Sequence, residues 1–124
     1  VKEEDGTQLR SGESLEDALT QFENTEINSF LVNCSPPEAI HQSIGVMKKS
    51  KKPFGGLPNG FKSVNLLNDE NDVSVLEKRD DFNIDKFVKD TLRFIENNAS
   101  IVGGCCEVSP KYIKALKNKI QTIK

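Results

Sequence analysis

Two short stretches, Phe30-Leu31-Val32-Asn33-Cys34 and Ile101-Val102-Gly103-Gly104-Cys105-Cys106, decide the fold. Each begins with an apolar run of the kind found in buried strands and ends in cysteine. A Ser-Pro pair, which is typical of a helix start, follows each stretch, as Ser35-Pro36 and as Ser109-Pro110. This repeated order of strand, cysteine and helix predicts parallel strands joined by helices, with the cysteines at the carboxyl ends of the strands.

Apolar residues at helical spacing predict four helices around these strands. The helices are expected over residues 14–24, 36–49, 83–97 and from 109 toward the end of the chain. Residues that can accept a hydrogen bond from the first turn precede three of them, and we expect Ser14, Ser35 and Asn83 to be N-caps. Glu38 lies three residues after Ser35, so this pair is expected to form a capping box.

Three strands are expected over residues 27–34, 53–60 and 100–104. The continuous apolar run of the first is typical of a strand that is covered on both faces. The second contains glycines and prolines that would also suit a loop, but its place between two helices favours a strand. Residues 61–82 lack periodicity and are rich in Asn, Asp and Glu, so they are expected to form either a lid or a disordered segment.

The predicted alternation of helices and strands indicates an α/β fold with a parallel sheet and right-handed crossovers. Three parallel strands leave two open sheet edges, and a closed (β/α)8 barrel needs about 250 residues, so this chain suits about half of a barrel. The chain starts at Val1 with a polar stretch that lacks the hydrophobic core of a signal peptide. We therefore expect a piece of a longer chain.

Composition narrows the possible partners. A net charge of −2, without aromatic residues in a basic stripe, argues against nucleic acid, and the lysines of residues 48–52 are interpreted as the solvated end of a helix. The longest apolar stretches are about five residues, against roughly 20 for a membrane helix.

Three cysteines cannot form a closed set of disulfides within one chain. The odd count favours thiols that are kept for chemistry or for metal binding, and a cytoplasmic location.

Cysteines at the ends of parallel strands can meet at one rim of the sheet. One strand separates the strands of Cys34 and Cys105, so about 9 to 10 Å lies between their axes. Tetrahedral zinc places its sulfurs roughly 3.8 Å apart, and adjacent Cys105 and Cys106 reach one ion only where the backbone leaves strand geometry. Gly103-Gly104 is expected to supply that freedom. On these residues alone, a metal site and three small buried side chains are equally open interpretations.

Three motifs carry a family resemblance: Val32-Asn33-Cys34 before Ser-Pro, Pro58-Asn59-Gly60, and the Gly-Gly-Cys-Cys element before Ser109-Pro110. Together they resemble the zinc-dependent homocysteine S-methyltransferase family. The resemblance implies that residues 1–124 are the C-terminal portion, the last three strands and their helices, of a homocysteine-binding (β/α)8 TIM barrel whose N-terminal half is absent.

The same resemblance implies an activity and a cofactor. Cys34, Cys105 and Cys106 would be the ligands of Zn²⁺, with a fourth position open to homocysteine. The homocysteine thiolate would then take a methyl group from a donor such as S-methylmethionine or S-adenosylmethionine, giving methionine. Asn59 ends the middle strand and is a candidate to support a cysteine or to be a weak fourth ligand, although an asparagine in a turn is the plainer interpretation. His41 and Tyr112 are interpreted as helix surface or flanking residues.

Two other functions stay open. Without the half of the barrel that would orient two substrates, the chain could be an inactive zinc-binding fragment and interaction module, pairing its open strand edges with the missing N-terminal half or with another chain. It could also be a redox protein that uses the vicinal Cys105-Cys106 pair, although the sequence has no CxxC motif and vicinal disulfides are strained. Metal content and methionine formation separate these interpretations.

Overall fold

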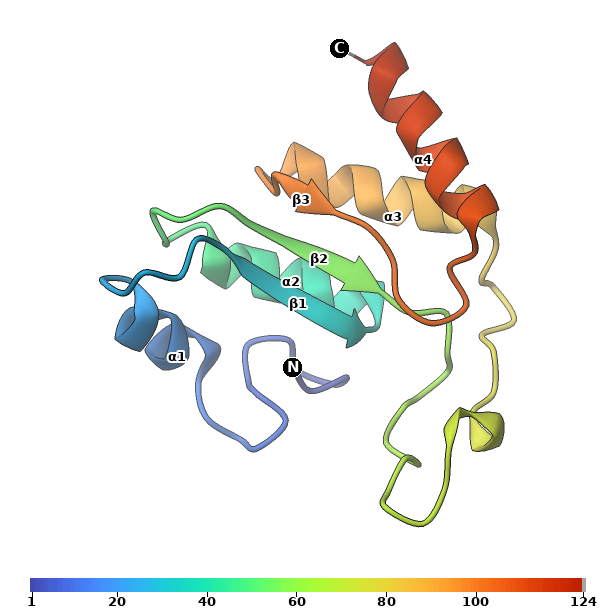
Figure 1. Ribbon diagram of the computed structural model, residues 1–124, viewed down its shortest axis with the longest axis horizontal. Coiled ribbons are helices and arrows are strands. Elements are labelled where there is room, and N and C mark those ends of the chain that lie inside the picture. The colour runs from blue at the N-terminus through green and yellow to red at the C-terminus, as the bar shows by residue number, and fades with distance from the viewer. Residues whose placement is uncertain (124) are drawn as a thin grey trace.

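A computed structural model describes residues 1–123 of the chain. Helices and strands alternate in the order α1 (Leu15–Phe22), β1 (Phe30–Ser35), α2 (Pro37–Met47), β2 (Phe54–Pro58), α3 (Ile84–Glu96), β3 (Ile101–Val102) and α4 (Pro110–Thr122). The strands form one parallel sheet with β2 in the middle, as Figure 1 shows. The α/β class, the alternation and the parallel sheet are confirmed. Within the described residues, no helix is both long and apolar enough to cross a membrane.

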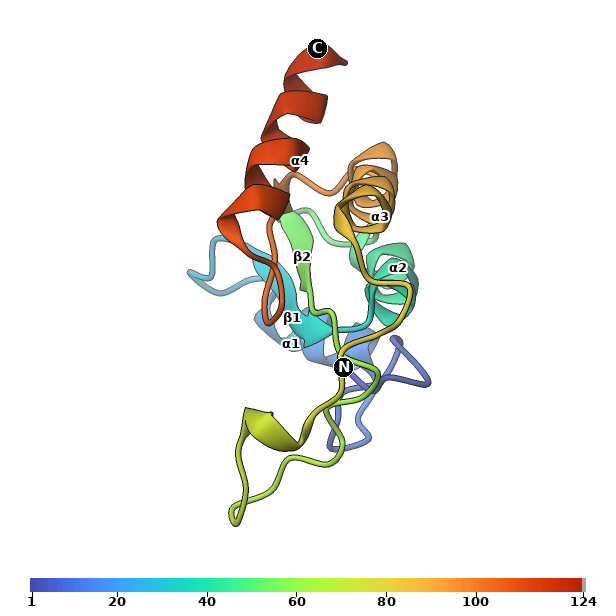
Figure 2. The same ribbon diagram turned by 90° about the vertical axis from the view of Figure 1, so that its right-hand side faces the viewer.

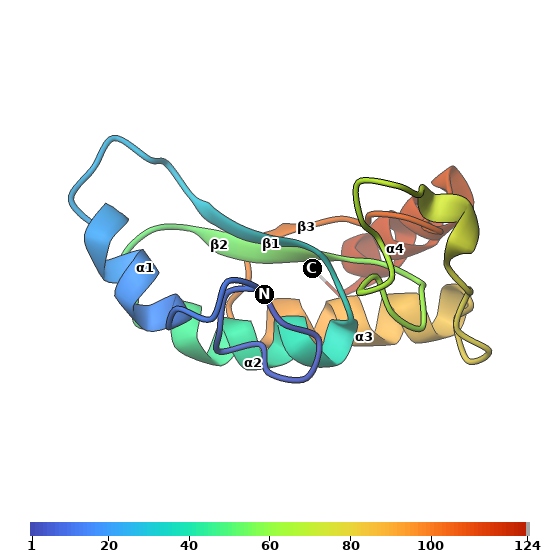
Figure 3. The ribbon, with the colours of Figure 1, turned by 90° about the horizontal axis from the view of Figure 1, so that it is seen from below.

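Helices α2 and α3 lie side by side against one face of the sheet (Figure 3), and α1 packs beside α2. Helix α4 packs on α3 (Figure 2). The main core lies between the sheet and these helices. Its buried side chains are Leu15, Leu19, Val32, Ile40, Ile44, Met47, Phe54, Phe94 and Ala99.

The other face of the sheet is open. Leu31 keeps 45% of its surface exposed and Ile101 keeps 36%, and the register places both beside Gly55 in one row across the sheet. The expectation that the first strand is covered on both faces is therefore wrong. Both covering helices follow their strands on the same side, and no helix within residues 1–123 lies over the opposite face.

The strands are shorter than expected, and one predicted cap is wrong. Ser35 pairs with Pro58 as the last residue of β1, and its buried hydroxyl donates to the Asn33 carbonyl at 3.2 Å. Pro36 therefore takes the N-cap position of α2, without a side-chain cap. The capping box fails with it, because Glu38 instead accepts two hydrogen bonds of 2.8 Å from the Arg79 guanidinium.

Among the other local predictions, two helix caps are confirmed and the interpretation of the lysines is not. Ser14 and Asn83 cap α1 and α3 as predicted, since their side chains accept from backbone N–H groups of the first turn. The lysines of residues 48–52 are not simply a solvated helix end. Lys52 Nζ donates to the carbonyls of Thr25 and Ile27 at 2.8 and 2.5 Å, and Lys49 pairs with Glu16 at 2.9 Å. These contacts join the segment between α2 and β2 to α1 and to the segment that leads into β1.

Residues 61–82 form a loop whose two ends pair with each other. Phe61 bridges Lys78, and the Arg79 N–H donates to the Gly60 carbonyl at 2.8 Å. The far part of the loop contains a short 3-10 turn, η1 (Val73–Val75), and stands away from the sheet in Figures 1 and 2. Leu66 is 61% exposed there. The loop is thus held at its base by backbone pairing and by the Arg79–Glu38 ion pair.

Tyr112 is not a surface or flanking residue. Its ring stacks on Phe82 with centroids 5.0 Å apart and meets the edge of Phe87 at 5.6 Å, in a second buried cluster that joins α4 to α3. His41 is also half-buried on α2, and its Nδ1 atom is enclosed without a hydrogen-bond partner among the described residues. Tyr112 therefore holds the helices together, which explains an aromatic residue near the start of α4.

Candidate metal centre

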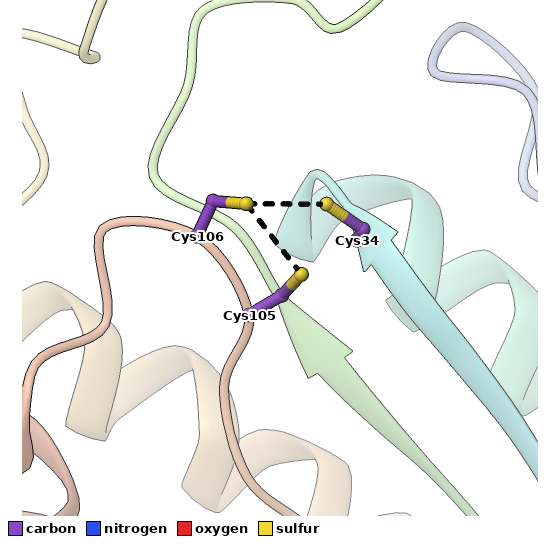
Figure 4. A group of neighbouring side chains, drawn as sticks. All are labelled: Cys34, Cys105 and Cys106. Carbon is purple, nitrogen blue, oxygen red and sulfur yellow. Dashed lines mark hydrogen bonds between the residues drawn. The ribbon is translucent and has the colours of Figure 1, made fainter. Parts of the chain in front are cut away.

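Cys34 stands at an irregularity of β1. Asn33 pairs with Leu57 and Ser35 pairs with Pro58, so Cys34 is the extra residue of a bulge. Its φ is 51°, in the left-handed region that residues with a Cβ rarely adopt. A bulge of this kind changes the direction of a side chain at the end of a strand. The thiol of Cys34 is thereby turned toward the loop after β3 (Figure 4).

Cys105 and Cys106 lie in that loop, beyond the end of β3, and backbone hydrogen bonds hold them to the end of β2. The Cys105 N–H donates to the Pro58 carbonyl at 2.9 Å, and the Gly60 N–H donates to the Cys106 carbonyl at 3.0 Å. Because the chain has left strand geometry, adjacent side chains need not point to opposite sides. Both thiols consequently turn toward Cys34.

The glycines before this pair act differently from our expectation. Neither Gly103 nor Gly104 has a positive φ; the left-handed residue of the turn is Glu107, with a φ of 68°. Gly104 is needed for space, since a Cβ there would lie 2.2 Å from Cγ1 of Val108. The turn folds back so closely on Val108 that no side chain fits at residue 104. Close packing of the turn, rather than unusual glycine dihedrals, brings the two thiols to one side.

The three thiols form a compact cluster (Figure 4). The Sγ atoms of Cys34 and Cys106 are 3.9 Å apart, as are those of Cys105 and Cys106, and all three Sγ atoms lie within 4.8 Å of one another. A disulfide bond is near 2.05 Å, so these are free thiols. Separations of this size are close to the roughly 3.8 Å between sulfurs around a tetrahedral zinc. All three residues are half-buried, and the cluster is a candidate metal centre.

The thiols differ in acidity because they share one site. Burial alone would raise the pKa of Cys34, but hydrogen bonds from the other two thiols and from Asn59 outweigh it and lower that pKa. Burial, together with hydrogen bonding to Cys34, raises the pKa of Cys105 to about 12. Burial and the neighbouring Cys34 charge also raise the pKa of Cys106. Three thiolates so close together need a cation to neutralise their charge.

Asn59 lies directly behind Cys34. Its amide Nδ2 donates to Cys34 Sγ at 3.6 Å, and its Oδ1 accepts from the Phe61 N–H at 3.1 Å. Asn59 is 1% exposed, and its backbone N–H donates to the Ser35 carbonyl at 3.2 Å. The structure thus brings Asn59 into contact with the cysteine cluster and fixes its amide orientation through the Phe61 hydrogen bond.

Comparison with known proteins places the chain in a family. The model of the family described as homocysteine S-methyltransferase matches residues 1–120. The chain belongs to that family. No solved structure matches it.

Its curated relatives are plant enzymes. The selenocysteine methyltransferase of Astragalus bisulcatus is 29% identical over 90% of this chain, and homocysteine S-methyltransferase 2 of Arabidopsis thaliana is 26% identical over 94%. Homocysteine S-methyltransferase 3 of Zea mays is 28% identical over 90%. These matches cover 32%, 34% and 32% of the relatives, so the chain spans about a third of their length.

Sequence reasoning missed one residue that touches the cluster's backbone. Arg10 donates from Nη2 to the carbonyl of Cys34 at 3.0 Å. It lies in the N-terminal segment that precedes α1, where neither periodicity nor a motif marks it. The only signal was its charge, and a single arginine in a polar stretch predicts no contact.

Proposed function

We propose that residues 1–124 are the zinc-binding C-terminal portion of a homocysteine S-methyltransferase, comprising the last three strands and their helices of a (β/α)8 barrel. The arrangement of Cys34, Cys105 and Cys106 at the carboxyl ends of parallel strands is the observation that supports this most. Active sites of such barrels lie at that end of the strands. The open sheet face, with Leu31 exposed, matches the side that would face a barrel interior.

The chemistry of the donor set fits zinc. Three sulfur ligands suit this ion, and the 3.9 Å separations agree with tetrahedral coordination. Three protein ligands leave one position for a further group, which is the pattern of catalytic rather than structural sites. Zinc bound by Cys34, Cys105 and Cys106 would supply Lewis acidity, which would lower the pKa of a substrate thiol. Reduced thiols also suit a cytoplasmic location.

The neighbouring protein residues hold the three cysteines in place and orient their thiols. Cys34 is presented by the bulge, while Cys105 and Cys106 are fixed by their backbone bonds to the end of β2. Asn59 donates a hydrogen bond to Cys34, which keeps that sulfur pointing at its partners and stabilises its anionic form. We assign Asn59 this supporting role. A role as a weak fourth ligand would require Oδ1, the only atom of the amide that can bind a metal, to leave the Phe61 N–H and turn toward the cluster.

The substrates follow from the names of the relatives, which specify homocysteine and selenocysteine. We propose methyl transfer from a small sulfonium donor, such as S-methylmethionine or S-adenosylmethionine, to the homocysteine thiol, giving methionine. The bond between the donor sulfur and the methyl carbon breaks, the donor leaves as a neutral thioether, and the thiol proton is released. Selenocysteine is chemically similar, because its selenol offers the same kind of soft nucleophile to a metal site.

Metal content tests the site. The purified chain is expected to hold one zinc ion, measured by elemental analysis after dialysis, and Cys34→Ser, Cys105→Ser and Cys106→Ser should each lose it. Ser63→Ala, on the exposed loop, is a matched control that should keep it. A metal-free wild-type chain with a reversible disulfide would refute the zinc proposal and support the redox interpretation.

Methionine formation separates enzyme from interaction module. The second candidate function is a zinc-binding module, favoured by the open face around Leu31 and Ile101 and by the share of the relatives that the chain spans. Its partner would be an N-terminal half-barrel or another chain at the strand edges. If zinc binds but neither the isolated chain nor a full-length parent protein forms methionine from homocysteine and S-methylmethionine, the module is supported. An inactive chain with an active parent would mean that the rest of the barrel is required. Turnover by the isolated chain would exclude it.

A further inference from the structure

The bulge at Cys34 leaves a carbonyl group outside the sheet. On either side of it, Asn33 and Ser35 keep their places opposite β2, and the Ser35 carbonyl accepts from the Asn59 N–H at 3.2 Å. The Cys34 carbonyl instead accepts from Nη2 of Arg10 at 3.0 Å. Since Cys34 has a φ of 51°, its conformation is unfavourable and persists only where neighbouring groups enforce it. Arg10 is one such group.

Arg10 is not a freely moving surface side chain. Its Nε donates to the Val1 carbonyl at 3.3 Å, so the guanidinium joins the first residue of the chain to the end of β1. The segment that carries Arg10 is fastened to α2 at Gly6, whose N–H donates to Gln42 Oε1 at 2.7 Å. The hydroxyl of Ser43, which is fully buried, donates to the Gly6 carbonyl at 2.6 Å.

We propose that Arg10 is a positioning residue for the metal centre. By holding the carbonyl of Cys34, it keeps the bulge in its left-handed conformation and the thiol turned toward Cys105 and Cys106. This rests on the proposed zinc site, but the structural part of it stands apart from metal binding. The segment before α1, more than twenty residues upstream of Cys34, therefore contributes to the geometry of the site.

Two variants isolate this effect. Arg10→Met keeps an unbranched apolar stem but removes the guanidinium group that donates to Cys34 and to Val1. Lys2→Met is the matched control, because Lys2 lies in the same segment, loses the same charge, and donates to Gln8 rather than to the bulge. The φ of Cys34 is read in the metal-free, full 124-residue chain from NMR, through the ¹³Cα and ¹³Cβ shifts and the HN–Hα coupling. We expect the positive φ to be lost in Arg10→Met and kept in Lys2→Met.

Zinc affinity is then measured by competition with a chromophoric chelator. Loss of a group that orients a metal ligand typically weakens metal binding by 10- to 100-fold, and we expect about 10-fold for solvent-exposed Arg10 and little change for Lys2→Met. A positive φ in Arg10→Met overturns the proposal, whatever the zinc affinity. If the wild-type chain binds no zinc, the proposed function fails, and the NMR result alone decides whether Arg10 positions Cys34.

Discussion

Gly104 shows how tightly single residues constrain the cysteine loop. Gly104→Ala would put a methyl group 2.2 Å from Val108, and overpacking of this kind costs about 1–3 kcal/mol of unfolding free energy. The Cβ of Val108 would also lie 2.5 Å from the added methyl group, so we expect Val108→Gly to make room and the double variant to recover part of the loss. Urea denaturation of the two single variants and the double variant measures this coupling. Purely additive losses would contradict a direct contact.

Asn59 offers a second test at this scale. Asn59→Ala leaves the Phe61 N–H without its partner in a buried place, at a cost of about 1–3 kcal/mol. Zinc affinity should fall as well, because the hydrogen bond to Cys34 is removed. Denaturation in the presence of a chelator separates the two effects. The exposed neighbour Asn33 supplies the control, and equal losses in Asn33→Ala and Asn59→Ala would show that burial of the amide is unimportant.

The grouping of the three cysteines could be anticipated because each follows an apolar strand and precedes a Ser-Pro helix start. The backbone conformations that bring the three thiols together could not be anticipated. Around the cluster, the left-handed conformations lie at Cys34 and Glu107, which are residue types that rarely adopt a positive φ. Gly103 and Gly104, where a positive φ would be unstrained, do not have one. The contact from Arg10 depends on the path of a polar loop. Such contacts follow from tertiary packing and leave no local pattern.

At the scale of elements, the ion pair between Arg79 and Glu38 joins the base of the 61–82 loop to α2. Hydrogen bonds from Arg79 hold the pKa of Glu38 below its usual value of 4.5. A carboxyl group whose pKa is lower in the folded state stabilises the protein above pH 4.5, and that contribution is lost as the pH falls through the lowered value.

Glu38→Gln should therefore be less stable than wild type at pH 7 and nearly equal to it well below pH 4.5. Urea denaturation across this range checks the expectation. Glu16→Gln, which breaks an exposed pair with Lys49, is the control and should change little at any pH. If the loss of unfolding free energy in Glu38→Gln stayed the same in acid, the side chain would contribute through packing rather than through charge.

The order of helices and strands could be predicted from the spacing of apolar residues. The residues at which each element begins and ends, and what each element packs against, could not. The spacing of apolar residues, which switches between helical and strand patterns along the chain, and the caps at Ser14 and Asn83 are local signals. Ser35 carried an equally good cap signal, but pairing with Pro58 drew it into the sheet. Gly55 illustrates the reverse case: a Cβ there would lie 1.6 Å from the Ile101 carbonyl oxygen, so a residue that weakens most strands is required in this one.

For the whole molecule, the open face and the two sheet edges predict self-association. Leu31 and Ile101 expose apolar surface beside unpaired strand edges, an arrangement that favours contact with other chains. Sedimentation velocity should show concentration-dependent association that Leu31→Lys reduces. Asn28→Lys, at an exposed position before β1, adds the same single positive charge and is the control. A wild-type chain that stays monomeric at every concentration would contradict this expectation.

The spacing of the cysteines along the chain has a further consequence. Cys34 and Cys106 are 72 positions apart, and both β2 and β3 lie between them in the sequence. A metal bound to both is a cross-link that closes one long loop, which restricts the unfolded chain more than the folded one. The three-stranded sheet is completed only when β3 has docked on β2, so the ligands come together only in an assembled sheet. Metal occupancy would then report how many chains in a sample have finished folding.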